Sequence, residues 1–261
     1  MLGYEFVQRG LLEVLLLSAG AGVLGTWAVM RGLAFYSHAV AAAAFPGLVL
    51  AAGLGFAPLL GAMGTGAVFA LGVGRLSTAR RAGHDALTAL ALVAALAAGT
   101  VLASNVFHSG SEVDTLLFGS LFALGPADLA LAFGVSVAAL AASLVLGPRW
   151  LAVGFDPGAA PALGVRSRLP DLALLALVAL AAVAALAAVG ALLATALLIV
   201  PAVTTRLWTA RLLAWQLWTV ALAAAEGLIG VWLSVELNAP PGATIATLAG
   251  VVFAVAAFAR R

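Results

Sequence analysis

The chain has 261 residues, of which 65% are hydrophobic and 8% are charged, and its formal net charge is +2. Soluble globular domains carry about one quarter charged residues, so this composition excludes an ordinary soluble fold. Cysteine is absent, which excludes disulfides and thiolate metal sites, and every basic residue is arginine, which excludes a phosphate-binding loop because that loop needs a lysine.

Apolar runs of about 20 residues, the length that crosses about 30 Å of hydrocarbon, recur along the whole chain. They are continuously apolar and rich in Ala and Leu, which favours helices over the alternating strands of a membrane barrel. The first run has no convincing basic segment before it and leads directly into another span, so we interpret it as a helix rather than a signal peptide. The predicted spans cover residues 11–30, 36–55, 57–74, 86–104, 127–146, 171–188, 190–204, 213–235 and 242–258.

The least certain part of this pattern is the pair 171–188 and 190–204, because both runs are short and could form one broken helix. We therefore expect an all-α membrane protein, a polytopic bundle of eight or nine transmembrane helices that forms a single domain over residues 1–261. Nine spans place eleven of the twelve arginines on one side of the membrane and leave Arg9 on the other. Because positive charge gathers in short cytoplasmic loops, this distribution predicts an external N-terminus and favours nine.

A charge inside a membrane span costs several kcal/mol, and two ionisable residues in the predicted spans stand out as candidates. Glu226 lies in the middle of ALAAAEGLIGVWLSVEL, and His38 lies early in the second span, in FYSHAVAAAAFPG. We interpret both as candidates for a permeation path. The alternatives are a protonated carboxyl group bonded between helices for Glu226 and a packed neutral histidine for His38.

The other polar groups carry weaker signals. His108 and Glu112 in the external loop are four residues apart and could share a helix face, but two ligands do not close a metal site. Solvated loop residues are the favoured interpretation for them and for Asn105 and Asp114. No special role is predicted for His84, which lies in a cytoplasmic loop.

The stretch GFDPGAAPALGV, in the longer cytoplasmic loop, has the pattern of a short helical segment. Asp156-Pro157 supplies an acidic N-terminal turn, and Gly164 is placed to end the segment. Such a segment beneath a membrane bundle could be gripped by a soluble partner, or it could lie at the interface without one.

Five stretches, in order, resemble the membrane-spanning permeases of ATP-driven importers for zinc, manganese and iron. They are VMRGLAFYSHAVAAAAFPGLVLA, VDTLLFGSLFALGPADL, GFDPGAAPALGV, AVGALLATALLIVPAVTTRL and LNAPPGATIATLAG. The resemblance covers nearly the whole chain. It implies a homodimer in the cell membrane, a separate cytoplasmic ATP-binding-cassette ATPase and an extracytoplasmic solute-binding protein, with no nucleic acid among the partners.

The resemblance also implies that the chain is a transport subunit and not an enzyme. It would bind no cofactor of its own, carry zinc, manganese or iron as cargo, and leave ATP to the partner subunit. The coupling segment that docks on the ATPase would be residues 155–165. Its matching positions in this sequence are Phe155, Asp156, Pro157, Ala162, Leu163 and Gly164.

One position departs from the family pattern. Members commonly carry Asp four residues before His in the second helix, followed by Pro-Gly, and the spacing puts both side chains on one helix face. Aligned without gaps on Pro46-Gly47, His38 stands at the Asp position and Ala42 at the His position. An imidazole suits zinc, copper, iron or nickel, whereas manganese favours carboxylates, so the metal stays open.

The expected function is thus an importer permease for a divalent transition metal that works by alternating access, with His38 and Glu226 facing the path and serving as candidate metal ligands. Three alternatives remain: the same type of permease for a non-metal solute, an ATP-independent channel or carrier, and a structural membrane scaffold.

Overall fold

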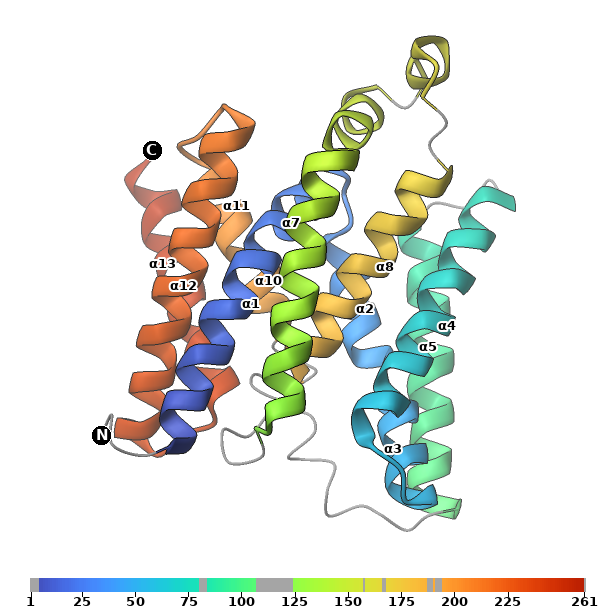
Figure 1. The fold of residues 1–261 in the computed structure, drawn as a ribbon, viewed down its shortest axis with the longest axis vertical. Coiled ribbons are helices and arrows are strands. Elements are labelled where there is room, and N and C mark those ends of the chain that lie inside the picture. The colour runs from blue at the N-terminus through green and yellow to red at the C-terminus, as the bar shows by residue number, and fades with distance from the viewer. Residues whose placement is uncertain are drawn as a thin grey trace.

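The computed structural model describes residues 5–79, 84–106, 124–156, 158–165, 168–186, 190 and 194–260. Every regular element among these residues is helical, and the long helices lie side by side along one axis (Figure 1). In chain order the elements are α1 (Glu5–Met30), α2 (Ala34–Ala43), α3 (Phe45–Leu54), α4 (Pro58–Ala79), α5 (His84–Val101), the π turn η1 (Leu102–Val106), α7 (Pro126–Phe155), the 3-10 turn η3 (Ala160–Leu163), α8 (Arg168–Ala184), α10 (Ala194–Leu198), α11 (Val200–Arg206), α12 (Leu212–Leu237) and α13 (Pro241–Ala259).

The predicted helical membrane bundle is confirmed. Within the described residues, seven stretches are long and apolar enough to cross a membrane, and α2 with α3 forms one of them. Two shorter apolar helices, Leu169–Ala184 and Ala194–Arg206, account for the pair whose separation the sequence left open. They are separate helices that run in opposite directions (Figure 1). The C-terminus therefore lies at the opposite end of the bundle from the N-terminus, as an odd number of passes requires.

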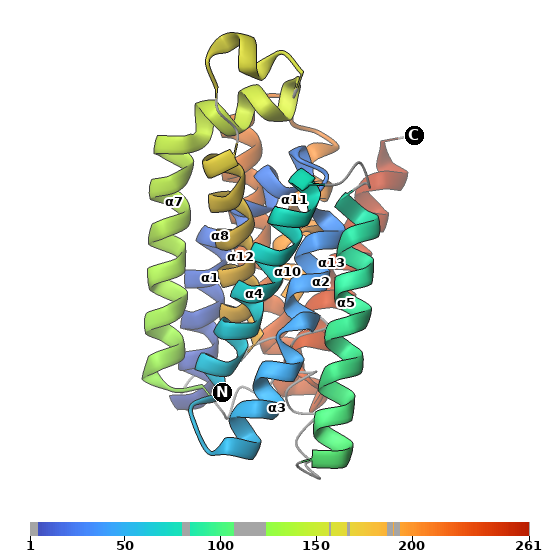
Figure 2. The ribbon, with the colours of Figure 1, turned by 90° about the vertical axis from the view of Figure 1, so that its right-hand side faces the viewer.

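The end of the bundle at which α1, α7, α11 and α13 finish is called the arginine-rich end below. The loops and helix ends there hold the described arginines Arg31, Arg75, Arg149, Arg168, Arg206, Arg211 and Arg260. The other end holds Arg9, near the start of α1. The turn η3 projects beyond the helices at the arginine-rich end, as the turned view shows (Figure 2).

Helix α7 is longer than predicted. The sequence placed the end of this span at residue 146, just before Gly147-Pro148, but the helix continues through Pro148 to Phe155. Tertiary contacts hold the extension, because the Trp150 ring packs edge-on against Trp27 at 5.5 Å and its Nε1 donates to the Pro170 carbonyl at 2.7 Å. These contacts outweigh the hydrogen bond that a proline removes from a helix.

Helix α1 forms the centre of the bundle. It packs along both α12 and α7, and its residues Leu17, Leu24 and Trp27 belong to the largest buried apolar cluster. Trp27 also donates from Nε1 to the Ser143 hydroxyl at 2.8 Å. Because the indole nitrogen is satisfied, this large side chain can be buried without a polar penalty.

Two passes are broken in the same way. The helix breaks at Ala44, two residues before Pro46, and again at Ile199, two residues before Pro201. A proline supplies no N–H to the preceding turn, so the backbone hydrogen bonds must be rearranged there. At the first break the Thr65 hydroxyl of α4 donates to the Ala44 carbonyl at 3.3 Å, which ties the break to a neighbouring helix.

The α2–α3 break is also clamped by glycine contacts. Gly47 of α3 and Gly61 of α4 touch through their backbones, and a methyl group on either residue would overlap the carbonyl oxygen of the other. Gly64, one turn further along α4, has nothing within 4 Å of the same position.

We expect Gly61→Ala to destabilise the protein by about 1–3 kcal/mol, the usual cost of overpacking a tight contact. The amount of monodisperse protein that survives heating in detergent measures this effect. Gly64→Ala is the matched control and should behave like the unmodified chain. Equal losses in both variants would show that the α3–α4 contact is not tight.

Candidate functional site

The imidazole of His38 joins two broken passes. His38 lies on α2, and its Nδ1 is 3.1 Å from the Thr195 hydroxyl of α10, so the two atoms share a hydrogen bond. The ring is partly buried, and Phe35 on the neighbouring turn is 39% exposed. Ala42, one turn further along α2, is buried and offers no ligand atom. His38 is therefore the one metal-binding type of side chain on this face of α2.

Glu226 is buried in the middle of α12 at 2% exposure. Its Oε1 has no hydrogen-bond partner within the described part of the chain. The next residue, Gly227, lies against Val14 of α1 and near Leu197 of α10. A carboxyl group placed this deeply among apolar helices is costly, and such residues are typically functional.

The structure does not join His38 to Glu226. No hydrogen bond connects them, and α10 packs against both α2 and α12. Among the described residues, no group of three His, Asp or Glu side chains lies close enough to hold a metal ion. A single copy of the described chain thus offers separate candidate ligands rather than a closed site.

The predicted coupling segment has the expected local geometry. Helix α7 ends at Phe155, which is 91% exposed, and the Asp156 carboxylate accepts hydrogen bonds from the backbone N–H groups of Gly158 and Ala159 at 2.8 and 3.0 Å. One 3-10 turn follows, and Gly164 ends it with a φ of 74°. That left-handed conformation favours glycine, because other residues pay a steric cost there.

The rest of the segment is largely exposed. Ala162 and Gly164 face solvent, and Leu163 closes the turn. Pro157 lies outside the described residues. The segment thus contains one short turn, and together with the exposed Phe155 at its start it is called the knob at residues 155–165 below.

Two of the weaker candidates, Asn105 and His84, lie within the described residues. Asn105 lies in η1, where its side-chain oxygen accepts a hydrogen bond from Ser104 at 3.1 Å. His108, Glu112 and Asp114 are outside the described residues. His84 is the first residue of α5, at the arginine-rich end.

One buried carboxyl group was missed from the sequence. Glu13 of α1 is fully buried, and neither of its oxygens has a hydrogen-bond partner among the described residues. Glu13 lies near the start of the first predicted span, 11–30, and was not among the candidate path residues. The available signal was its spacing, because Glu5, Arg9 and Glu13 follow each other at four-residue intervals on one helix face.

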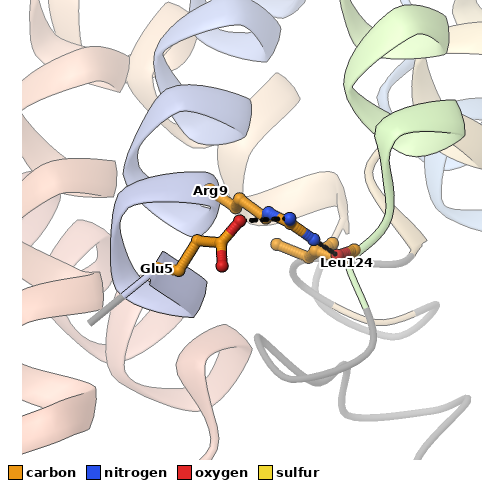
Figure 3. A network of polar contacts seen from close by, with 3 residues as sticks. All are labelled: Glu5, Arg9 and Leu124. Carbon is orange, nitrogen blue, oxygen red and sulfur yellow. Dashed lines mark hydrogen bonds and ion pairs between the residues drawn. The ribbon is translucent and has the colours of Figure 1, made fainter.

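Only the first two members of that row, Glu5 and Arg9, are paired. Arg9 forms an ion pair with Glu5 and donates from Nη1 to the Leu124 carbonyl at 3.5 Å, just before α7 (Figure 3). The guanidinium thus links the first turns of α1 to the residue just before α7, and no ion pair among the described residues joins it to Glu13. Glu13 joins Glu226 as a second intramembrane acid without an assigned partner.

Comparison with known proteins places these features in a family. The model of the ABC 3 transport family matches residues 3–260. The manganese transport system membrane protein MntC of Halalkalibacterium halodurans is 31% identical over 258 residues, which cover 99% of this chain and 88% of that protein. The manganese import system permease protein ScaB of Streptococcus parasanguinis is 28% identical over 255 residues, covering 98% and 91% of the two chains.

A solved structure is similar over the same length. A chain in the structure of PsaBC from Streptococcus pneumoniae in complex with Fab superposes with a TM-score of 0.85 at 25% sequence identity. The match covers 97% of this chain and 91% of that one. The helical arrangement of nearly the whole chain therefore belongs to a fold that is already known.

Proposed function

Since the chain belongs to the ABC 3 transport family, we propose that this multi-pass membrane permease carries a divalent transition metal into the cell. This cargo is supported by the similarity of the chain, over nearly its whole length, to permeases named for manganese transport. Manganese is thus the first cargo to test. Zinc and iron should be tested as well, because His38 stands where the family usually has a carboxylate and an imidazole suits these two metals.

We place the metal path along the partly uncovered face of α2. If the His38 Nδ1–H donates to the Thr195 hydroxyl, the Nε2 lone pair is free to bind a metal. A hydrogen bond to the second ring nitrogen fixes the tautomer and the orientation of a ligating histidine. One imidazole cannot close a site alone, so we propose that a second copy of the chain brings its own His38 to the same path.

We propose that a separate chain, an ATPase, supplies the energy for transport. An ATP-binding-cassette ATPase would bind the knob at residues 155–165, and its closure on ATP would switch the bundle by alternating access. A solute-binding protein would deliver the ion at the opposite end. Glu226, which is buried beside α1 and α10, would act where these helices move relative to one another.

The test combines purification with uptake. We expect an ATP-binding-cassette ATPase to co-purify with the tagged chain, and cells that lack the chain to lose uptake of radioactive manganese, zinc or iron. Uptake that persists after ATP depletion would indicate an ATP-independent carrier. Normal cellular content of all three metals would instead support a non-metal solute.

A further inference from the structure

A cavity opens at the arginine-rich end, away from both α2 and the coupling knob. Its volume is about 670 Å³, and it lies between the connection from α11 to α12 and the last turn of α13. The residues that line it are Arg206, Leu207, Trp208, Thr209, Ala210, Ala256, Ala259 and Arg260. The proposed transport function uses none of them.

The cavity is positively charged and has no compensating acid. Neither Arg206 nor Arg260 forms an ion pair with a carboxylate in the described part of the chain, and no described lining residue is acidic. A guanidinium binds phosphate through two parallel hydrogen bonds, which makes arginine the preferred residue for such groups.

One of the two guanidinium groups is held in place before any ligand arrives. Arg206 donates from Nη1 to the carbonyls of Thr209 and Ala210 at 3.2 and 3.4 Å. Its guanidinium carbon also lies 4.8 Å from the ring centroid of the buried Trp215. These contacts reduce the entropy that the side chain would lose on binding an anion.

The surroundings of the cavity match a membrane interface. Trp208 is 51% exposed in the cavity wall, and tryptophan is enriched at the level of lipid headgroups. On α13, the exposed side chains Val251, Val255 and Phe258 form a row of four- and three-residue steps that leads toward Arg260. An acyl chain could pack along this row of exposed apolar side chains, which ends next to the charged cavity.

We propose that this cavity binds the phosphate of an anionic phospholipid from the leaflet at the arginine-rich end. The two guanidinium groups would hold the headgroup, Trp208 would cover it, and the acyl chains would follow α13. The positive-inside rule assigns this end to the cytoplasmic leaflet, where basic pockets between helices bind anionic headgroups.

The experiment measures lipid retention by native mass spectrometry of the protein released from nanodiscs that contain equal amounts of phosphatidylglycerol and phosphatidylcholine. We expect the unmodified protein to retain phosphatidylglycerol preferentially. Arg260→Gln should weaken that retention about fivefold, the change expected for one arginine near an anionic surface. Trp208→Ala should weaken it as well, without changing the charge.

Arg149→Gln is the matched control, because Arg149 is exposed at the same end but does not line the cavity. Equal losses in Arg149→Gln and Arg260→Gln would overturn the proposal, since they would indicate unspecific attraction. Loss of the lipid on adding inorganic phosphate at constant ionic strength would point to a free-anion site instead. Unchanged lipid retention in Arg260→Gln, with loss of a co-purifying ATPase, would make this surface a protein contact and would also overturn the proposal.

Discussion

Replacing His38 with alanine, or Glu226 with glutamine, is expected to lower metal uptake by about tenfold or more, as loss of groups at a metal site commonly does. His38 is the single candidate ligand on its face of α2, so its loss leaves nothing to bind the ion there. Glu226 is buried without a described partner for one oxygen, so an amide keeps its shape and removes its charge. Uptake of manganese, zinc and iron into cells measures the effect.

Each variant has a control in which the same type of side chain is replaced outside the proposed path. His84→Ala removes a histidine at the arginine-rich end, and Glu236→Gln removes an exposed carboxylate near the end of α12. Both controls should retain normal uptake, and all four variants should reach the membrane in equal amounts. Full uptake in His38→Ala and Glu226→Gln would remove these residues from the path and leave them as packing groups.

Ala42→His extends the same test in the opposite direction, since it would return a second ligand one turn from His38. A gain in metal binding in this variant would support the α2 face as the site.

Truncating Phe155 to alanine is expected to disconnect the permease from its ATPase. An aromatic side chain that is 91% exposed at the tip of a projecting segment has the character of a binding hot spot, whose removal costs about 2 kcal/mol or more. That loss corresponds to about a thirtyfold weaker complex. The quantities to measure are the ATPase that co-purifies with the chain and the metal taken up per ATP hydrolysed.

Leu151→Ala provides the control, because Leu151 is also an exposed apolar residue of α7, one turn before Phe155. This variant should bind the ATPase normally. If Phe155→Ala also binds it normally and couples uptake to hydrolysis, the knob at residues 155–165 is not the docking element.

Much of the fold could be predicted, because hydropathy and helix length respond to the same thickness of hydrocarbon. The long passes follow directly from their apolar runs, and the breaks at Ala44 and Ile199 each have a visible proline two residues later. The extension of α7 could not be predicted from local sequence. It depends on contacts of Trp150 with Trp27 and with the Pro170 carbonyl, which only the folded bundle brings together.

The candidate site divides along similar lines. The burial of Glu226 follows from its place in the middle of a span, and the turn from Asp156 to Gly164 follows from capping residues that act locally. Thr195 carried no signal, because it lies 157 residues from its hydrogen-bond partner His38. Glu13 was overlooked since a carboxylate near the predicted start of a span is usually solvated, whereas here α1 begins earlier and buries it.

The short α8 bears on how the protein enters the membrane. At 17 residues it is about 26 Å long, less than the hydrocarbon thickness of about 30 Å. The pass formed by α10 and α11 is shorter still. Neither helix matches the bilayer on its own, yet both have faces buried against neighbours within the described bundle. Because α1 is made before both passes and packs against both, we expect contacts with α1 to hold these two short passes in the membrane as the bundle assembles.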